Sequence, residues 1–492
     1  MLSIFLIIPI VSAIVTALIN KRHVSVFGVL AIVSSLVIFL FALAATPVVS
    51  LGGRVEDFGP ISGMLFLDAL GMILVLIISF IGFAAALYSE GYLRVEMKKG
   101  IIGRSRIKQF YVFYHVFMFA MLFSVLAKNP IVMWAAIEAT TLSTAFLISF
   151  YNKPSATEAA WKYLIINSVG LLVGFFGTLT ILSLAYTGVS DASITWTDLL
   201  SRAPHLNPLA VKIAFIFIFV GYGTKAGFAP MHTWLPDAHG KAPAPISALL
   251  SGVLLNTAFL AILRFKQVVD LSVGPDFTAH IFILFGCISI LIMAFTLLFQ
   301  QNYKRLLAYS SIENMGIIAL GFGFGGVGVF GALLHIIYHA IAKSMLFFSA
   351  GNVLLKYSTT KIKNVSGALT VLPITAPLLL VGMFAVTGVP PFGTFLSKFS
   401  ILSSGAHAHH LLVLALAPLL GLVFVGFLQN FTAMIFGHTA VDIEGAPLPK
   451  GESGAFTIIP ILLLLVTLVA LSVHIPVVLH NLIQTAASGF IS

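Results

Sequence analysis

Long apolar runs, separated by short polar stretches, follow one another along almost the whole chain. Apolar runs of about 20 residues are typical of membrane-spanning α-helices, because that length crosses the hydrocarbon core of a bilayer. The pattern predicts an all-α polytopic membrane protein with about fourteen transmembrane helices. The predicted helices cover residues 2–20, 24–45, 62–88, 109–127, 129–150, 158–187, 207–229, 244–265, 275–299, 305–327, 329–356, 371–405, 410–436 and 454–480.

Two of the predicted helices are interrupted by proline. Pro230 and Pro236 interrupt and follow the seventh helix, and Pro390 and Pro391 lie within the twelfth. A break in a membrane helix frees backbone polar groups, which are tolerated only where they meet protein or line a cavity. Broken helices in matching positions of two halves indicate an internal repeat of the transporter type. We therefore expect two five-helix repeats, each with one broken helix, and the odd number of helices per repeat makes them inverted.

The repeats divide the chain into four predicted parts. These parts are an N-terminal three-helix segment with a cytoplasmic loop (1–108), the first repeat (109–265), the second repeat (275–436), and a C-terminal helix and tail (437–492). The linkers between helices are too short for a soluble domain.

Composition and charge support this class and restrict the chemistry. Hydrophobic residues make up 59% of the chain and charged residues 9%, whereas soluble domains carry about 25% charged residues. The net charge of +10 is mainly a topology signal, because sixteen loop Lys and Arg residues follow odd-numbered helices and five follow even-numbered ones. Positive loops face the cytoplasm. The asymmetry predicts that both termini are extracytoplasmic and that residues 94–108 are cytoplasmic, and it leaves no reason to expect nucleic-acid binding.

Cysteine content limits redox chemistry. Cys287 is the sole cysteine of the sequence, and one thiol cannot ligate an iron–sulfur cluster or form an internal disulfide. We therefore expect no cofactor on this chain, and any redox chemistry belongs to partner proteins.

Charged side chains nevertheless occur deep inside several predicted helices. They are Glu138, Lys225, Glu313, Lys343 and Lys398. A charge at the centre of a bilayer costs about 2.5–3.5 kcal/mol even on the translocon scale, so such residues usually mark ion or proton pathways. These five residues are the first candidates for a functional site.

One predicted helix adds two histidines to its lysine. His335, His339 and Lys343 are spaced i, i+4, i+8, and each step of four residues rotates by about 40°, so the three side chains share one helical face. Three protonatable groups in a row favour a proton relay over a packing face with hydrogen-bonded histidines. A metal site is the other alternative, but no carboxylate or cysteine lies near in sequence, and we expect no bound metal.

Five segments carry a resemblance to a known family. They read "WAAIEATTL", "GYGTKAGFAPMHTWLPDAHGKAPAPISALLSG", "KRLLAYSSIENMGIIALG", "LLHIIYHAIAKSMLFFSAGNV" and "GVPPFGTFLSKF". The chain resembles the antiporter-like, proton-translocating membrane subunits of respiratory complex I, of multi-subunit cation/proton antiporters and of group 4 membrane-bound hydrogenases. These sequence segments are most similar to those of the hydrogenase-4 component F subfamily.

The resemblance implies roles for matching residues. Glu138 corresponds to a glutamate that pairs with the lysine of the first broken helix, here Lys225, which would compensate for the buried ammonium. Lys343 corresponds to a central lysine between two half-channels, and Lys398 to the terminal residue of the second broken helix. The histidines that precede Lys343 also match those of several members.

A second set of residues is assigned to proton access or linking. Asp237 and His239 follow the first break, near the expected cytoplasmic access. Some members carry a histidine on the eighth helix, where this chain offers Ser251, so that the link from Lys225 to Lys343 would depend on water or on Asn256. The access or linking candidates are Asp237, His239, Ser251, Asn256 and Glu313.

The resemblance implies a proton-translocating, non-catalytic subunit of an oxidoreductase complex in the cytoplasmic (inner) membrane of a prokaryote. Its partners would be other membrane subunits of a hydrogenase or complex I-like assembly, a soluble redox arm, and the lipid bilayer. Its cargo would be protons, with sodium left open. Alternatives are a subunit of a sodium/proton antiporter, a coupling subunit for inorganic-carbon uptake, and a non-transporting scaffold, against which the buried charges argue.

Overall fold

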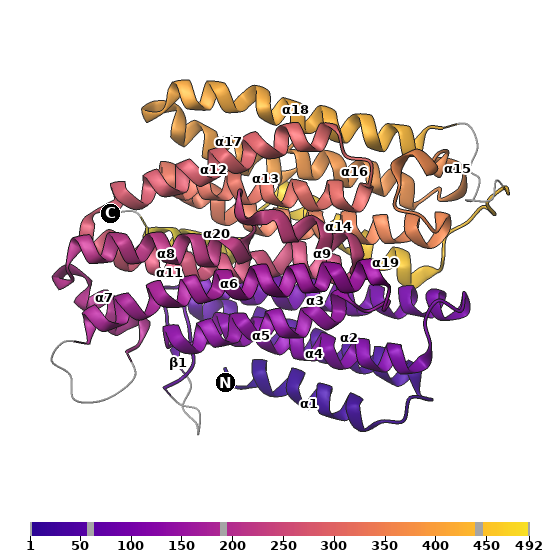
Figure 1. Cartoon of the computed structure of the whole chain (residues 1–492), viewed down its shortest axis with the longest axis horizontal. Coiled ribbons are helices and arrows are strands. Elements are labelled where there is room, and N and C mark those ends of the chain that lie inside the picture. Colours follow the sequence, from indigo (N-terminus) through magenta and orange to yellow (C-terminus); the bar gives the residue numbers. More distant parts are fainter. Residues whose placement is uncertain (1, 57–62, 187–193, 438–445, 491–492) are drawn as a thin grey trace.

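The computed structural model describes residues 2–56, 63–186, 194–437 and 446–490. Most helices run side by side along the long axis of the molecule, with α1 (Ile4–Leu18) at one edge and α18 (His410–Ile435) at the other (Figure 1). Among the described residues, twelve spans are long and apolar enough to cross a membrane, and two shorter apolar helices, Ile4–Leu18 and Thr375–Thr387, accompany them. Each of the fourteen predicted segments overlaps one of these helices, which confirms the fold class.

Among its described residues, the N-terminal part holds three helices and one antiparallel pair of short strands. Its elements are α1, α2 (Val24–Ser50), β1 (Val55–Glu56), β2 (Phe66–Leu67) and α3 (Ala69–Lys98). The antiparallel β1–β2 pair was not predicted. The predicted start of the third helix, residue 62, lies outside the described residues, and the helix itself begins at Ala69.

Asp68 fixes the start of α3. Its carboxylate accepts a hydrogen bond from the Gly71 amide at 2.9 Å, which caps the helix. It also pairs with Arg264, whose Nη2 lies 2.6 Å from Oδ1. Burial raises the pKa of Asp68, but the guanidinium beside it lowers that pKa, and the net shift is downward. A charged pair therefore ties the start of α3 to a distant helix.

The described residues of the first repeat form eight α-helices. They are α4 (Arg104–Leu126), α5 (Pro130–Ile148), α6 (Pro154–Ala185), α7 (Trp196–Arg202), α8 (Pro208–Ala226), α9 (Leu235–Lys241), α10 (Ala244–Leu249) and α11 (Leu255–Val273). A π-helical turn, Leu250–Leu254, joins α10 to α11, and it was not predicted. Such π-turns are rare and occur frequently at functional sites.

The second repeat and the C-terminal part supply the remaining helices. They are α12 (Pro275–Leu298), α13 (Tyr303–Phe324), α14 (Val327–Tyr357), α15 (Ala368–Val371), α16 (Thr375–Thr387), α17 (Gly393–Ala408), α18, α19 (Ala455–Val473) and α20 (Val477–Ser488). The prediction of one helix over 454–480 is wrong in its extent, because His474–Pro476 separates α19 from α20. Proline cannot continue the hydrogen-bond ladder of α19.

Both predicted breaks are present. Helix α8 ends at Gly227 and α16 ends at Gly388, each with φ of 85°, a left-handed conformation that favours glycine. The backbone groups freed at the first break find protein partners, as membrane burial requires. The Trp234 indole donates to the Thr224 carbonyl at 2.8 Å, and the Ala229 amide donates to the Ser289 hydroxyl at 3.1 Å.

Helix α20 lies at the end of the bundle where α2 and α11 finish. Thr485 donates to the Ser50 carbonyl at 3.2 Å, and Gln267 donates to the Gly489 carbonyl at 3.4 Å. The side of the membrane that this end faces stays a prediction.

The contact between α6 and α8 requires glycine. A Cβ atom added to Gly221 would lie 2.6 Å from the Gly170 carbonyl oxygen and would overlap the Gly174 backbone. Overpacking of this kind costs about 1–3 kcal/mol. We expect Gly221→Ala to lower the melting temperature of the purified protein. Gly421→Ala in α18 is the control, because no atom lies within 4 Å of its added Cβ. Equal melting temperatures for the two variants would contradict the packing argument.

Candidate ion-translocation site

Lys225 ends α8 just before the first break and is fully buried. Its Nζ donates to the Thr141 hydroxyl at 2.8 Å and to the Tyr163 hydroxyl at 2.6 Å. The same ammonium lies 4.7 Å from the centroid of the Tyr163 ring, within the range of a cation–π interaction. Two hydroxyls and a ring face thus replace water around the charge.

Glu138 is joined to Lys225 through the Thr141 hydroxyl and forms no direct hydrogen bond with it. Its carboxylate accepts hydrogen bonds from Ser168 at 2.6 Å and from Thr141 at 3.3 Å. The Thr141 hydroxyl therefore accepts from the lysine and donates to the glutamate. The physical reason is position, since Thr141 lies one helical turn from Glu138 on α5 and occupies the space between the two charges.

A direct buried ion pair occurs in the second repeat instead. Lys398 Nζ lies 3.1 Å from Glu313 Oε1, and the two side chains are 8% and 1% exposed. Lys398 also donates to the Thr387 carbonyl at 3.3 Å, at the end of α16. Its stem runs along Gly388, where an added Cβ would lie 2.9 Å from the lysine Cδ. Glu313, predicted as a linking residue, is the counter-ion of Lys398.

The two repeats place their charges in corresponding elements. Glu138 and Glu313 lie on the second helix of each repeat, α5 and α13, and Lys225 and Lys398 lie on the broken helices. Lys225 precedes its break and Lys398 follows its own, yet the Lys398 side chain reaches back to the end of α16. Each broken helix therefore presents an ammonium beside its break.

His335, His339 and Lys343 lie on α14 and all have 0% exposure. The Lys343 ammonium donates to the Ser310 hydroxyl and the Leu307 carbonyl of α13. The His335 and His339 rings stack with their centroids 6.3 Å apart, as expected for side chains on one face. Both ring nitrogens of His339 have no hydrogen-bond partner within the described part of the chain. An unpartnered buried polar group costs about 1–3 kcal/mol, so packing alone does not account for this residue.

Asn314 on α13 links His335 to the Glu313–Lys398 pair. This residue was not identified from the sequence. Its amide nitrogen donates to the Ser310 carbonyl and to the Glu313 carboxylate, and its oxygen lies 3.0 Å from His335 Nε2. His335 Nδ1 also shares a hydrogen bond with Ser397 at 2.8 Å. The signal was available, because an amide beside a glutamate in the middle of an apolar helix must find partners inside the protein.

The two residues predicted near the cytoplasmic access lie in different environments. Asp237 is 25% exposed and lies 3.6 Å from Lys162 and 3.5 Å from Arg305. His239 is fully buried, its Nδ1 lies 2.8 Å from the Leu235 carbonyl oxygen, and its Nε2 has no partner among the described residues. Asp237 is therefore a surface group, and His239 is an interior one.

Ser251 and Asn256 do not bridge Lys225 and Lys343. The Ser251 hydroxyl shares a hydrogen bond with Ser311 at 2.7 Å, and the Asn256 amide donates to the Gly252 carbonyl of its own segment at 3.0 Å. Ser251 lies in the π-helical turn and contacts α13 next to the residue that binds Lys343. The turn thus places a hydroxyl against α13, at the residue that follows Ser310.

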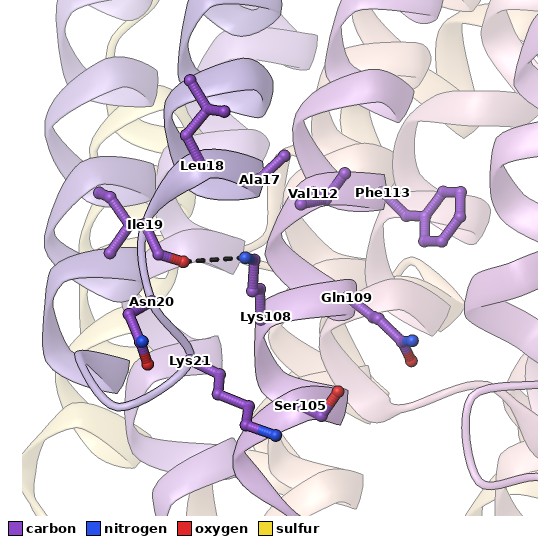
Figure 2. A pocket seen from close by; sticks show the side chains of 10 residues that line it. All are labelled: Ala17, Leu18, Ile19, Asn20, Lys21, Ser105, Lys108, Gln109, Val112 and Phe113. Carbon is purple, nitrogen blue, oxygen red and sulfur yellow. Dashed lines mark hydrogen bonds between the residues drawn. The ribbon is translucent and has the colours of Figure 1, made fainter.

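A groove elsewhere on the surface holds none of the candidate residues. It has a volume of about 600 Å³ and lies between α1 and α4, where Lys108 donates to the Ile19 carbonyl at 2.8 Å (Figure 2). Among the described residues, no group of three or more His, Cys, Asp or Glu side chains could hold a metal ion. The absence of a metal or cofactor stays a prediction.

Comparison with known proteins gives the family. The family described as "NADH:quinone oxidoreductase/Mrp antiporter, TM" matches residues 127–425. The chain belongs to this antiporter family. Its relatives include a hydrogenase-4 component F homolog of Methylacidiphilum infernorum, 36% identical over 88% of this chain and 86% of that protein. The predicted resemblance is confirmed.

Other antiporter-family relatives are longer. Hydrogenase-4 component B of Escherichia coli is 29% identical over 68% of this chain, and the putative antiporter subunit mnhA2 of Staphylococcus aureus is 31% identical over 80%. In both cases the alignment spans about half of the relative, 49% of its length.

Two solved structures share the fold. A chain of the archaeal membrane-bound sulfane sulfur reductase superposes with a TM-score of 0.87 at 24% identity and covers 100% of this chain and 98% of its own. A chain of the Mrp complex from Dietzia superposes with a TM-score of 0.86 at 18% identity, with coverage of 99% and 96%.

The direct ion pair predicts unequal effects for two glutamine substitutions. Removing one partner of a buried pair costs about 3–5 kcal/mol, whereas Glu138 is half-buried and bonds to hydroxyls. We expect Glu313→Gln to lower the melting temperature of the purified protein more than Glu138→Gln. Adding Lys398→Met to Glu313→Gln should recover part of the loss. A Glu313→Gln variant no less stable than Glu138→Gln would contradict the pairing.

Proposed function

We propose that this protein is a proton-translocating, antiporter-like subunit of a redox-driven membrane complex, of the group 4 hydrogenase or complex I-like type. The observation that carries the proposal is that three of the buried lysines, Lys225, Lys343 and Lys398, are each held by polar groups inside an apolar bundle. Buried ionisable residues at this depth are expensive and are typical of ion and proton pathways.

Local polar connections support proton movement in the second half. Lys343 donates to the Ser310 hydroxyl, Asn314 donates to the Ser310 backbone carbonyl and to the Glu313 carboxylate, and Glu313 pairs with Lys398. The Ser310 hydroxyl can both donate and accept a proton, whereas a backbone carbonyl only accepts, so water would have to carry the proton between these groups. An ion pair that opens and closes changes the proton affinity of its lysine. The chain itself would carry out no redox chemistry.

The relatives support the setting of a larger assembly. A hydrogenase-4 component F homolog, a hydrogenase component B and a subunit of an antiporter all match most of this chain. We infer partner membrane subunits, a soluble redox arm that supplies the driving force, and a location in the prokaryotic cytoplasmic membrane. Electron transfer in the soluble arm would be coupled to the lysines through conformational changes of the membrane helices.

A subunit of a sodium/proton antiporter is the second candidate. The match to the Staphylococcus aureus antiporter subunit over 80% of this chain favours it. Membrane vesicles distinguish the two functions, because an antiporter moves protons against a sodium gradient without any electron donor.

The central lysine gives the sharpest test of proton movement. Arginine keeps the positive charge but stays protonated in proteins, so Lys343→Arg should stop proton uptake into vesicles driven by the electron donor of the complex. Lys343→Ala should do the same, and His339→Gln should have a milder effect. Assembly is checked on a native gel. Near-wild-type uptake by an assembled Lys343→Arg complex would return Lys343 to a structural role.

A further inference from the structure

Glu96 is a buried carboxylate that contacts none of the lysines Lys225, Lys343 and Lys398. Glu96, near the end of α3, is 3% exposed. Its Oε1 accepts a hydrogen bond from the Tyr151 hydroxyl at 2.6 Å, and Tyr151 shares a further hydrogen bond with Tyr92 at 3.1 Å. Its Oε2 has no partner within the described part of the chain. A carboxylate left half satisfied in the interior is costly, and neither the helix nor its packing requires one here.

Glu96 lines a cavity of about 450 Å³ at one end of the bundle. The lining residues lie at or just after the ends of the third, fifth, seventh, ninth and eleventh predicted helices. The loops after these odd-numbered helices therefore meet at one end of the bundle, as the loop charges predict. Glu96 is the only acidic side chain among the described residues that line the cavity. The other charged or titratable lining groups are Lys99, Tyr151, Lys153, Lys241 and Lys304. The lysines around this one carboxylate offset part of the cost of burying it.

Polar groups lead from this cavity toward the central lysine. Lys304 is 1% exposed and donates to the Ala242 carbonyl at 2.6 Å. The Ser247 hydroxyl lies 3.3 Å from the same carbonyl oxygen and 2.8 Å from the His239 carbonyl oxygen. The His239 imidazole is buried, and its Nε2 has no hydrogen-bond partner among the described residues.

The ring of His239 faces the relay helix. Its centroid lies 5.8 Å from that of Phe347, which is one turn beyond Lys343 on α14, and 6.2 Å from the Trp234 ring. Trp234 in turn contacts Tyr163, whose hydroxyl binds Lys225. His239 therefore stands where a route from the cavity would reach the interior between the two lysines.

We propose that Glu96 is a proton-uptake residue and that the lysine-lined cavity is the vestibule from which His239 and Lys343 are loaded. The proposal rests on the proposed function and names the uptake site for it. A proton from water in the cavity neutralises the carboxylate, and its release inward restores the charge. The step therefore consumes no oxidant, reductant or other co-reactant.

Glutamine at position 96 tests the proposal in vesicles that contain the whole complex. Glu96→Gln keeps the size and an acceptor for Tyr151 but cannot exchange a proton, so donor-driven proton uptake should fall about tenfold or more. Glu96→Asp, which restores a titratable group, should recover part of the rate. Glu90→Gln is the matched control, because Glu90 is buried on the same helix but pairs with Arg94 and does not line the cavity.

A second measurement does not depend on transport. Dicyclohexylcarbodiimide modifies protonated carboxyl groups that it can reach, so peptide mass spectrometry of the treated wild-type complex should find the adduct on Glu96 and little on Glu90. Labelling of Glu96 should increase as the pH is lowered. This readout also covers a Glu96→Gln variant that fails to assemble.

The outcomes separate this proposal from the proposed function. If the wild-type complex pumps, Lys343→Ala stops it, and assembled Glu96→Gln pumps at the wild-type rate, the uptake role is rejected and the function stands. Absence of the adduct from Glu96 at every pH also rejects the uptake role. If wild-type vesicles move no protons with the electron donor, the proposed function fails, whatever the labelling shows.

Discussion

An ammonium group inside a bilayer-sized apolar bundle must find polar partners within the protein, and much of this structure follows from that constraint. Lys225 finds two hydroxyls and an aromatic face, Lys343 finds a hydroxyl and a carbonyl, and Lys398 finds a carboxylate. The break after α16 serves the same need, because it leaves the Thr387 carbonyl as an acceptor for Lys398. Glycine at 227 and 388 permits the ends of α8 and α16.

Helix α13 connects the central site to the second half. One stretch of it supplies the carbonyl and hydroxyl that hold Lys343, the hydroxyl that meets Ser251, and the glutamate that pairs with Lys398. Asn314, in the same stretch, contacts the Ser310 backbone carbonyl, the Glu313 carboxylate and the His335 ring. The first half differs, since the hydrogen bonds of the described residues do not join Lys225 to Lys343 and aromatic rings lie between them. The two repeats thus have the same architecture, but they differ in the hydrogen bonds that lead to Lys343.

The sequence was sufficient for the fold and for the deep charges. Runs of apolar residues locate the spans, and Gly-Pro clusters locate both breaks, because these signals are local and depend on backbone chemistry. The row of His335, His339 and Lys343 was also predictable, since helical periodicity alone decides a shared face. The predicted extent of the last helix, 454–480, was wrong because the prediction continued the helix past Pro476.

Partners across helices could not be predicted in the same way. Thr141 separates Glu138 from Lys225. Glu313, which was predicted as a linking residue, is the counter-ion of Lys398. Which hydroxyl stands between two charges depends on the rotation of each helix by a fraction of a turn. The π-helical turn that presents Ser251 and the β1–β2 pair before α3 depend likewise on tertiary packing, which outweighs local propensity.

The claim that Lys343 and the Glu313–Lys398 pair form one proton pathway depends most on Asn314. The decisive measurement is donor-driven proton uptake, followed with a pH-sensitive dye, into vesicles that contain the complex with Asn314→Leu. Leucine has a similar volume and cannot hydrogen-bond, so the assembled variant should lose uptake, while Asn256→Leu, which alters an amide bonded only to its own segment, should retain it. Wild-type uptake by an assembled Asn314→Leu complex would contradict the pathway.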